Sequence, residues 1–562
     1  MPRLNKPLIE YPRPQLVRGS YLCLNGEWEY AIRNDKKVPD TFNGTIMVPF
    51  SPETELSGVN RMVGPDERLY YRLKFTLDDS FIKDKVILHF TAVDQIADVY
   101  INDAHLGLHV GGYLPFEFDI KPFLEKENVL LVKVKDVTDT SHFSRGKQKI
   151  KRGGIWYTPQ SGIYMPVWLE AVSKDYVQDL RITPDIDNKV VRINVISDSP
   201  SATVKIMGKE RTVATNTEIE YPIESMHLWS PEDPYLYPFT VKTRDDEVSS
   251  YFAMRKVSTI MVDGHKVLAL NNKPYFMKGV LDQGYYKGSL YTPQSYQDYT
   301  ADIGLVKSMG FNTIRKHIKI EAPRWYYECD RMGVLVWQDF INGGGKYKNS
   351  IVLKPLVTGK HQKDNHYHAF ARDEVEGRME AKQEFRDIIN YLYNYPCIVL
   401  WTIFNEGWGQ FDAKDIYHGL KDLDKTRLFD HASGWHDQGV SDVKSMHVYF
   451  KHVKMPKTHD IKNRAVVLSE FGGFQLPIKD HMKVGKKTYH SYKTVNSWLM
   501  AYEKCILKDV VRNIPKGLCA CIYTQLSDVE DELNGFVTFD RQVVKASVEK
   551  IRLINDKIKF PE

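Results

Sequence analysis

The feature that most constrains this fold is an alternation, from residue 259 onward, of short apolar runs with stretches of helical periodicity. The clearest helical stretch extends from Arg372 to Tyr393, where apolar residues recur at the i, i+3, i+4, i+7 spacing. Eight apolar runs occur, at residues 275–281, 313–318, 333–340, 397–406, 427–433, 445–450, 465–473 and 518–528. Eight strand–helix units over about 300 residues match the size of a TIM barrel. The sequence therefore predicts a (β/α)8 barrel over residues 259–562.

The chain before the barrel reads as short strands, without a helical period of useful length. Within residues 128–137, for example, Val132 and Val134 alternate with lysines, which predicts a strand with one buried and one solvated face. Residues 173–258 repeat this style with fewer strands. We expect a β-sandwich over residues 1–172 and a smaller one over residues 173–258.

Composition and charge exclude several classes of protein. A hydrophobic content of 42%, a charged content of 27% and a net charge of +5 over 562 residues describe an ordinary soluble protein of several domains. Since no long Lys/Arg block occurs, neither nucleic acid nor a membrane is an expected partner. No signal segment or bilayer-spanning run is visible, and six scattered cysteines fit free thiols in a reducing compartment. We therefore expect a cytoplasmic protein.

Two glutamates stand at the carboxyl ends of apolar runs. Glu406 ends the fourth run and Glu470 the seventh, in the segments IVLWTIFNE and VLSE. A carboxylate is costly to desolvate, so its place at the end of a core strand requires a reason, either a structural ion pair or chemistry. Strand ends meet at the mouth of a barrel, where chemistry is carried out. Two carboxylates from different strands are the minimum equipment for cleaving a glycosidic bond.

The residues around both glutamates resemble signatures of glycoside hydrolase family 2, which includes β-galactosidases, β-glucuronidases and β-mannosidases. WTIFNEGWGQ (401–410) resembles its acid/base segment, and LSEFGG (468–473) its nucleophile segment. GGYLPFEFDI (111–120) resembles the N-terminal sugar-binding jelly roll, and MHLWSPEDPYLY (226–237) falls where an immunoglobulin-like domain is expected. The chain is identified as a member of this family. That implies a jelly roll over residues 1–172, an immunoglobulin-like β-sandwich over 173–258 and a catalytic TIM barrel over 259–562.

The resemblance also implies roles for individual residues. Glu406 would be the general acid/base and Glu470 the nucleophile of a retaining double displacement, with Asn405 bonded to the sugar 2-OH. No metal or organic cofactor is needed. Tyr449 matches the family tyrosine that bonds the nucleophile, and a packing aromatic is the alternative reading. Arg315 resembles the arginine that orients the nucleophile, and a generic ion pair is the alternative.

The other candidates are polar or aromatic residues at strand ends. His447 lies by alternation on the same side as Tyr449, so it either lines a sugar pocket or is a structural histidine. The rest either contact substrate or support the barrel mouth: Asp282, Gln283, Trp337, Asp339, Trp435 and Gln525. Trp337 and Trp435 are natural stacking platforms, because one face of a pyranose ring is apolar.

The sequence constrains the sugar only weakly. β-Glucuronidases that resemble this chain carry Asn-x-Lys after the eighth strand, where this chain has Glu532-Leu533-Asn534. An acidic residue there would repel a uronate, so a neutral sugar is favoured and a β-galactosidase-like activity is the first interpretation. β-Glucuronidase and β-mannosidase activities remain as alternatives.

The sequence leaves the class of function and the oligomeric state open. A non-catalytic carbohydrate-binding protein is the competing function, although the presence of Glu406, Glu470 and Asn405 together argues against it. The expected partner is a carbohydrate, a small oligosaccharide or glycoside. Both a monomer and a homo-oligomer are compatible with the sequence.

Overall fold

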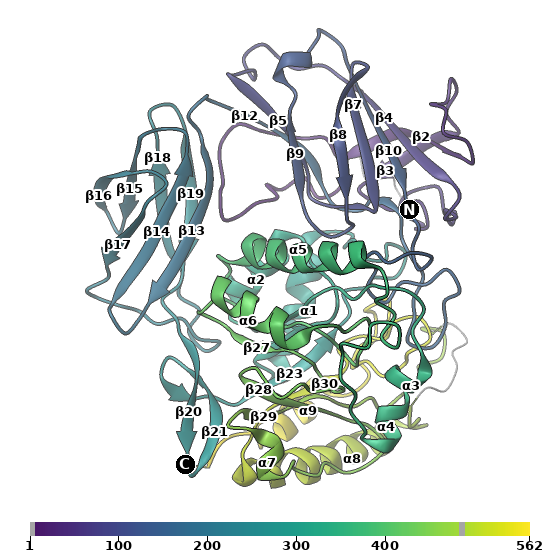
Figure 1. Cartoon of the computed structure of the whole chain (residues 1–562), viewed down its shortest axis with the longest axis vertical. Helices are drawn as coiled ribbons and strands as arrows, with labels where there is room; N and C mark the ends of the chain where they lie inside the picture. Colours follow the sequence, from purple (N-terminus) through teal and green to yellow (C-terminus); the bar gives the residue numbers. More distant parts are fainter. Residues whose placement is uncertain (1–5, 483–488, 562) are drawn as a thin grey trace.

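The N-terminal part of the computed structural model is a β-sandwich at one end of the molecule (Figure 1). The structure describes residues 6–482 and 489–561. One sheet has four strands, in the order β1 (Tyr21–Cys23), β12 (Val167–Val172), β5 (Lys85–Phe90) and β9 (Phe116–Asp119). The other has six, in the order β3 (Gly44–Val48), β2 (Gly26–Arg33), β4 (Arg68–Phe75), β10 (Asn128–Lys135), β7 (Ile96–Ile101) and β8 (Ala104–Val110). A two-stranded ladder joins β6 (Val93–Asp94) to β11 (Gly162–Ile163).

The predicted alternation in this sandwich is confirmed. Along β10 every second side chain is buried, including Val132 and Val134, while Lys133 and Lys135 are partly exposed. The buried residues of the two sheets form one hydrophobic cluster around Trp28, Phe90 and Val99. Burial of these apolar surfaces is the main contribution to the stability of the domain.

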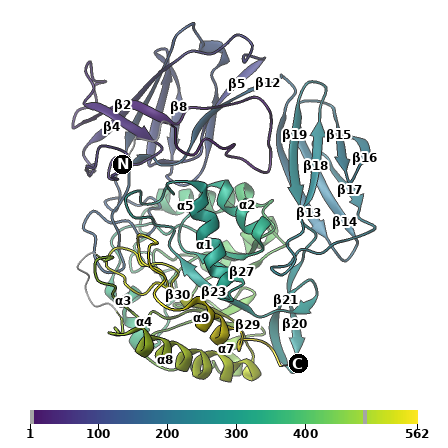
Figure 2. The same ribbon diagram turned by 180° about the vertical axis from the view of Figure 1, so that it is seen from behind.

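The second part is a smaller β-sandwich that lies beside the first and contacts the barrel (Figure 2). Its first sheet consists of β13 (Val177–Asp185), β14 (Val190–Ser197) and β17 (Glu218–Pro222). Its second sheet consists of β16 (Lys209–Ala214), β15 (Ser201–Ile206), β18 (Tyr237–Lys242) and β19 (Glu247–Phe252). A three-stranded antiparallel sheet follows, built from β20 (Val257–Val262), β21 (His265–Leu270) and β22 (Lys273–Pro274).

The third part is an eight-stranded parallel sheet that curls into a barrel, as predicted. Each of the eight apolar runs overlaps one strand: β23 (Met277–Asp282), β24 (Thr313–Lys316), β25 (Leu335–Asp339), β26 (Ile398–Thr402), β27 (Leu428–Asp430), β28 (Val443–Val448), β29 (Ala465–Gly472) and β30 (Leu518–Thr524). In chain order β23 to β27 are neighbours, and β23 also pairs with β30, which closes the ring through β29 and β28. Among the described residues no ladder joins β27 to β28, so the barrel is closed except at that seam.

Helices surround the barrel on its outer side (Figure 1). The α-helices in the described part of the chain are α1 (Tyr296–Ser308), α2 (Pro323–Met332), α3 (Asn349–Val352), α4 (Lys354–Thr358), α5 (Val375–Leu392), α6 (Ala413–Leu423), α7 (Thr458–Ile461), α8 (Val495–Cys505) and α9 (Val548–Asn555). Helix α5 is the stretch predicted from Arg372 to Tyr393, and it buries Phe385, Ile388, Ile389 and Leu392. It begins three residues later than predicted because Arg372 is turned inward, where its Nε donates to the carbonyl of Gly409.

A long loop of the first sandwich, residues 136–160, reaches the barrel mouth. The backbone N–H of Arg145 donates to the carbonyl of Asn342, which follows β25. The ring of Trp156 lies 5.1 Å from that of Trp408, two residues after Glu406. Part of the site is therefore built by a segment far away in the sequence.

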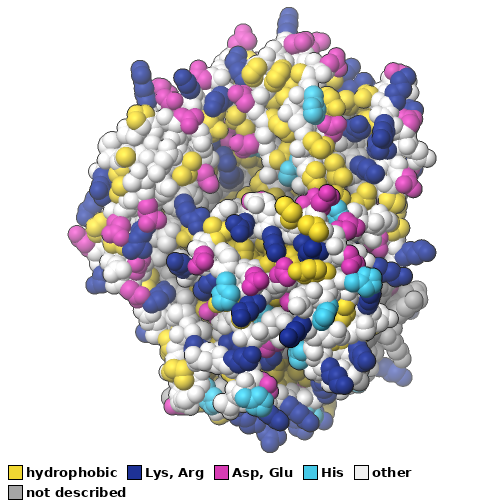
Figure 3. All heavy atoms as spheres, in the orientation of Figure 1, with side chains coloured by type: hydrophobic (Ala, Val, Ile, Leu, Met, Phe, Trp, Pro, Cys, Tyr) yellow, Lys and Arg dark blue, Asp and Glu magenta, His cyan; other side chains and the backbone are white. Residues whose placement is uncertain are grey.

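All six cysteines are free, and five of them are buried. No helix in the described part of the chain is long and apolar enough to cross a membrane. On the face of the molecule shown in Figure 3, charged side chains of both signs are interspersed.

Candidate active site

The structure brings the two glutamates together at the carboxyl ends of the barrel strands. Glu470 lies within β29, whereas β26 ends at Thr402, so Glu406 stands in the loop beyond its strand. Glu406 has a left-handed backbone (φ 50°), and its N–H donates to the carbonyl of Ser433 at 2.9 Å. A carboxylate oxygen of each glutamate and a ring nitrogen of His447 all lie within 4.8 Å of one another.

Arg315, on β24, binds the ionised carboxylates of this site. Its guanidinium binds Asp339 through two contacts, Nε–Oδ1 at 2.9 Å and Nη2–Oδ2 at 3.0 Å. It also donates to Glu470 Oε1 at 3.1 Å and to Asn405 Oδ1 at 2.8 Å. The buried guanidinium therefore links its own strand, β24, to β25, to β29 and to the loop after β26. It can bind several partners at once because it is planar and carries five N–H donors.

Tyr449 contacts the other oxygen of Glu470. Its hydroxyl donates to Glu470 Oε2 at 2.6 Å. Burial by itself would raise the pKa of Glu470, but the Arg315 guanidinium and the Tyr449 hydroxyl hold this pKa below its usual range, and a proton on His447 would lower it further. Glu470 is therefore kept as a carboxylate at neutral pH.

Glu406 is in the opposite electrostatic situation. Burial raises its pKa above the usual range and the nearby charge of Glu470 adds to this effect, while His447 would act in the other direction only if its Nδ1 carried a proton and donated it. The side chain keeps 14% of its surface exposed. The same pocket thus favours a proton on one glutamate and none on the other, which is the division that acid/base pairs require.

His447, on β28, touches both glutamates. The parallel ladder places it directly opposite Glu470, and its Nδ1 lies 2.8 Å from Glu406 Oε1 and 3.6 Å from Glu470 Oε2. Gly434 makes this approach possible: a Cβ at that position would stand 2.6 Å from Nδ1. The ring of Trp435 lies 5.5 Å from that of His447.

Not every predicted residue reaches this centre. Trp337 is fully buried, and its indole N–H donates to Met277 Sδ at 3.3 Å, so its ring packs inside the barrel and offers no face to a substrate. Asp282 belongs to a separate buried network, where Lys316 Nζ bridges it to Glu321 at 2.5 and 2.8 Å. The prediction of substrate contact is wrong for Trp337. Every residue of β25 is buried, so neither face of this strand is open to a substrate at Trp337. Gln525 is buried too, and it bonds Gln283 and Asn534.

Several residues of the site were not predicted. The Nδ1–H of His317 donates to Asp339 Oδ2 (2.8 Å), and because His317 lies two residues after Arg315, strand alternation would have indicated it. Lys147 comes from the long sandwich loop, and its Nζ lies 3.7 Å from Glu532 Oε2. Its ammonium also faces the ring of Trp408, at 5.7 Å. No local signal in a loop of one domain reveals contact with another domain.

Lys147 also offsets the negative charge of Glu532. That carboxylate is buried and accepts a hydrogen bond from the hydroxyl of Tyr157, besides the ion pair with Lys147. The expectation that Glu532 would repel an acidic sugar rested on an unpaired charge. Because Lys147 faces it, Glu532 does not present an unpaired negative charge to an acidic sugar.

Within residues 6–482 and 489–561, Glu406, His447 and Glu470 are the single set of three acidic or histidine groups close enough to share a cation. The 2.8 Å separation of Nδ1 and Oε1 is a hydrogen-bond distance. Two ligands of one tetrahedral zinc would stand about 3.3 Å apart, given bonds of about 2 Å. A hydrogen bond therefore accounts for the contact between His447 and Glu406 without a cation.

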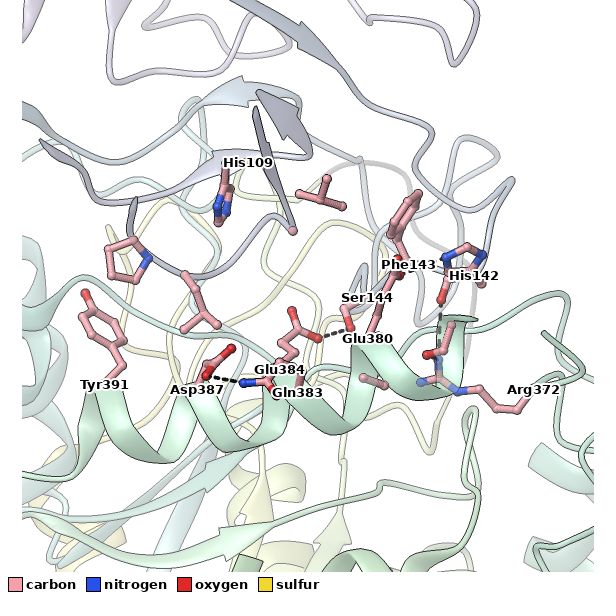
Figure 4. A pocket seen from close by; sticks show the side chains of 16 residues that line it. His109, His142, Phe143, Ser144, Arg372, Glu380, Gln383, Glu384, Asp387 and Tyr391 are labelled. Carbon is pink, nitrogen blue, oxygen red and sulfur yellow. Dashed lines mark hydrogen bonds and ion pairs between the residues drawn. The ribbon is translucent and has the colours of Figure 1, made fainter. Parts of the chain in front are cut away.

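A cavity lies at some distance along the chain from the two glutamates, between the first sandwich and helix α5. About 400 Å³ in volume, it lies between the end of β8 and helix α5, and His109, Ser144 and Glu384 are among its lining residues (Figure 4). It contains neither of the two glutamates. It marks the contact between the first sandwich and the barrel.

Models of one protein family match almost the whole chain. Residues 22–171 match the sugar binding domain of glycosyl hydrolases family 2, residues 175–255 match the model described as glycosyl hydrolases family 2, and residues 260–550 match its TIM barrel domain. The barrel match alone covers more than half of the chain.

Curated relatives carry two kinds of name. A β-galactosidase of Thermoanaerobacter pseudethanolicus is 23% identical over 461 residues, which are 75% of this chain and 56% of that protein. The β-galactosidase large subunit of Leuconostoc lactis is 26% identical over 67% of this chain and 60% of its own length. A putative β-glucuronidase of Formosa agariphila is 23% identical over 72% and 48%. The chain thus spans only about half the length of these relatives.

Solved structures share the fold at low sequence identity. A β-D-glucuronidase of Dictyoglomus thermophilum superposes with a TM-score of 0.75 at 17% identity, covering 98% of this chain and 99% of that one. A β-galacturonidase of Eisenbergiella tayi bound to glycerol gives 0.71 at 18% identity, covering 98% and 99%. The three-part architecture, the paired strand-end glutamates and the family models agree: the chain belongs to glycosyl hydrolase family 2.

Proposed function

We propose that this chain is a retaining exo-β-glycosidase, which removes terminal non-reducing β-linked sugars by double displacement. One observation carries the proposal: oxygens of Glu406 and Glu470 lie within 4.8 Å of each other, with His447 beside them. Retaining enzymes keep the two carboxyl groups about 5–5.5 Å apart, whereas inverting enzymes need about 6.5–9.5 Å to admit a water. The short separation favours retention.

The two carboxyl groups have complementary roles in this mechanism. Glu470, ionised and held by Arg315 and Tyr449, attacks the anomeric carbon. Glu406, whose burial favours the protonated form, donates to the leaving oxygen and afterwards activates water. Asn405, fixed by Arg315 through its Oδ1, keeps its amide N–H groups for the sugar 2-OH. A bond to that hydroxyl strengthens as the oxocarbenium ion forms.

For the sugar, a β-galactosidase-like specificity is the first proposal. The curated relatives that match this chain at 23–26% identity include proteins named β-galactosidase and one named putative β-glucuronidase. A neutral sugar is compatible with a mouth in which Glu532 and Lys147 offset each other's charge.

A β-glycuronidase is the second candidate, favoured by one specific observation. The Lys147 ammonium is 6% exposed and has Glu532 as its ion-pair partner at 3.7 Å, longer than a hydrogen bond. A sugar carboxylate could compete with Glu532 for this cation. The β-mannosidase alternative gains no comparable support.

A panel of aryl β-glycosides tests both proposals. Galactoside, glucoside, mannoside, glucuronide, galacturonide and arabinoside substrates are assayed with the wild type and with Glu470→Gln. We expect turnover of at least one sugar by the wild type and a loss of several orders of magnitude in the variant. Equal, negligible turnover in both proteins would instead favour a carbohydrate-binding protein.

Stereochemistry is tested separately. The anomer of the first-formed product, followed by NMR, should retain the β configuration. Glu406→Ala should still react with a dinitrophenyl glycoside, stall as the glycosyl-enzyme, and be rescued by azide. An α product would contradict double displacement, and an absence of rescue would remove Glu406 as the acid/base.

A further inference from the structure

A chain of hydrogen bonds leads away from the far side of His447. Its Nε2 lies 2.9 Å from Ser433 Oγ, which lies 2.9 Å from Ser469 Oγ. The Ser469 hydroxyl in turn donates to the carbonyl of Met446 at 3.3 Å. All three side chains are buried.

This chain determines which nitrogen carries a proton. A carbonyl only accepts, so Ser469 gives its single proton to Met446 and must accept from Ser433. Ser433 therefore gives its proton to Ser469 and must accept from His447. Nε2 is consequently an N–H, and the side of the ring that faces Glu406 has a free lone pair or a second proton.

The charges around Nδ1 act in both directions. Glu406, Glu470 and Asp430, from the loop after β26 and from β29 and β27, bring negative charge toward the ring. Lys147 and Arg315 bring positive charge to the two glutamates. The imidazole ring itself is fully buried. A single proton shared by the imidazole and Glu406 fits the 2.8 Å contact between Nδ1 and Oε1.

We propose that Glu406 Oε1 and His447 Nδ1 hold one proton between them, and that this is the proton delivered to the leaving group. His447 is thus the positioning residue of the acid. The proposal rests on the proposed function and deepens it, since it concerns the protonation of the same site.

The proton balance over the cycle is complete. In the first step Glu470 bonds to the anomeric carbon, the bond to the aglycone oxygen breaks, and that oxygen takes the shared proton. Glu406 is then a carboxylate that faces an unprotonated Nδ1. In the second step water bonds to the anomeric carbon, the bond to Glu470 breaks, and a proton of that water restores the Glu406–His447 pair.

Replacement of the ring tests this assignment. His447→Phe keeps an aromatic ring but removes the acceptor, so the pair loses the site that stabilises its proton. On a phenyl glycoside we expect kcat/KM to fall on the order of 10²-fold and its basic limb to move down by about one pH unit. On a dinitrophenyl glycoside, whose leaving group needs no proton, kcat/KM should change less than about threefold.

Three results of this experiment would overturn the proposal. An upward shift of the basic limb would mean that His447 stays a cation that donates to a carboxylate. An unchanged basic limb would mean that the ring of His447 contributes packing alone. Equal losses on both leaving groups would mean that His447 acts on the nucleophile instead.

A second variant changes the proton position without removing the ring. Ser433→Ala ends the chain at Nε2, so the ring can turn to its other tautomer, and the basic limb should move in the same direction by a smaller amount. The backbone bonds of Ser433 to Glu406 and Phe404 are kept. Ser308→Ala is the control, because its hydroxyl donates to the carbonyl of Leu305 on helix α1, away from the chain of hydrogen bonds. A shift in Ser308→Ala equal to that in Ser433→Ala would contradict the proposed path.

A direct measurement does not depend on turnover. In histidine-labelled protein, the ¹⁵N signals of His447 are identified by their loss in His447→Phe. We expect Nε2 to be an N–H throughout the pH range in which the enzyme is active, because Ser433 can only accept from it. A bare Nε2 would refute the proposal even in an active enzyme. A wild type as inactive as Glu470→Gln would refute the proposed function, and the ¹⁵N signals would still decide the proton position.

Discussion

At the scale of single residues, the site is an arrangement of opposed charges rather than a set of independent groups. Arg315 binds Asp339, Glu470 and Asn405 at once, so the removal of any one partner changes the others. A buried charge that loses its partner costs far more than an exposed one. Residues of this centre should therefore affect activity and stability together.

Tyr449→Phe tests the stabilisation of the nucleophile. The change removes the 2.6 Å bond to Glu470, which helps to hold the pKa of that carboxylate down. The pKa should rise, so the acidic limb of kcat/KM should move to higher pH, because Glu470 must be ionised to react. A hydrogen bond to a charged group contributes about 1.5–3 kcal/mol, so the limb should move by about one to two pH units.

The measurement is the pH dependence of kcat/KM on a dinitrophenyl glycoside. Tyr523→Phe is the control, a buried tyrosine of the same barrel whose hydroxyl accepts from the N–H of Phe474. A shift to lower pH in Tyr449→Phe, or the same shift in both variants, would contradict the role given to Tyr449.

Glu532→Gln tests the reading of Lys147. With its carboxylate partner neutralised, the buried lysine should accept an anionic substituent of the sugar. The ratio of kcat/KM for a β-glucuronide to that for a β-galactoside should rise at least about tenfold, equivalent to about 1.4 kcal/mol. Lys147→Met is the opposite control and should lower this ratio. An unchanged ratio in both variants would place the pair outside the sugar site.

At the scale of elements, helix α5 connects the barrel to the first sandwich. Its buried face carries Phe385, Ile388 and Ile389 against the barrel. Its other face lines the cavity under β8, where Glu384 and Asp387 are visible along one side of the helix (Figure 4). The helix therefore has a packing role and an interface role on different faces.

Phe385→Ala tests the packing role. Truncation of a buried phenylalanine leaves a cavity and costs about 3–5 kcal/mol, so the thermal midpoint of the barrel should fall by several degrees. Met379→Ala is the matched control on the same helix, since its side chain is 66% exposed and its loss should leave the midpoint within about one degree. Scanning calorimetry measures both. Equal losses would contradict the assigned faces.

The sequence predicted elements better than it predicted what their side chains contact. Periodicity located all eight barrel strands and α5, because a buried face imposes a regular pattern on any strand or helix. It failed at Trp337, since a strand that is buried on both faces gives no alternation that separates the core from the mouth. It placed Glu406 at the end of a strand, whereas the strand ends four residues earlier and a left-handed residue turns the side chain into the site.

At the scale of the whole molecule, the contact between the sandwich and the barrel contains ionisable groups. Glu384 accepts a hydrogen bond from Ser144 of the sandwich loop, and burial raises the pKa of Glu384 to about 7. A carboxyl group with a raised folded pKa binds a proton more tightly in the folded protein than in the unfolded chain. Its contribution to the free energy of unfolding therefore decreases as pH rises from about 4 to about 7.

Glu384→Gln should remove that penalty. The difference in thermal midpoint, variant minus wild type, should be near zero at pH 5 and should become positive by pH 8, by an amount equivalent to about 1–3 kcal/mol. Glu376→Gln, an exposed change on the same helix, is the control and should show no such trend. A difference that decreases with rising pH would mean that Glu384 is stabilised as an anion.

The sequence by itself determined the order of domains, the barrel and the two glutamates, because these depend on local periodicity and on short contiguous motifs. Only the tertiary structure decided how the charges pair. Lys147 meets Glu532 across two domains, and Arg315 meets Asp339 and Glu470 across three strands. The physical reason is that a charge interacts through space, with whichever partner the fold brings within a few ångströms, and spacing along the chain carries no record of that distance.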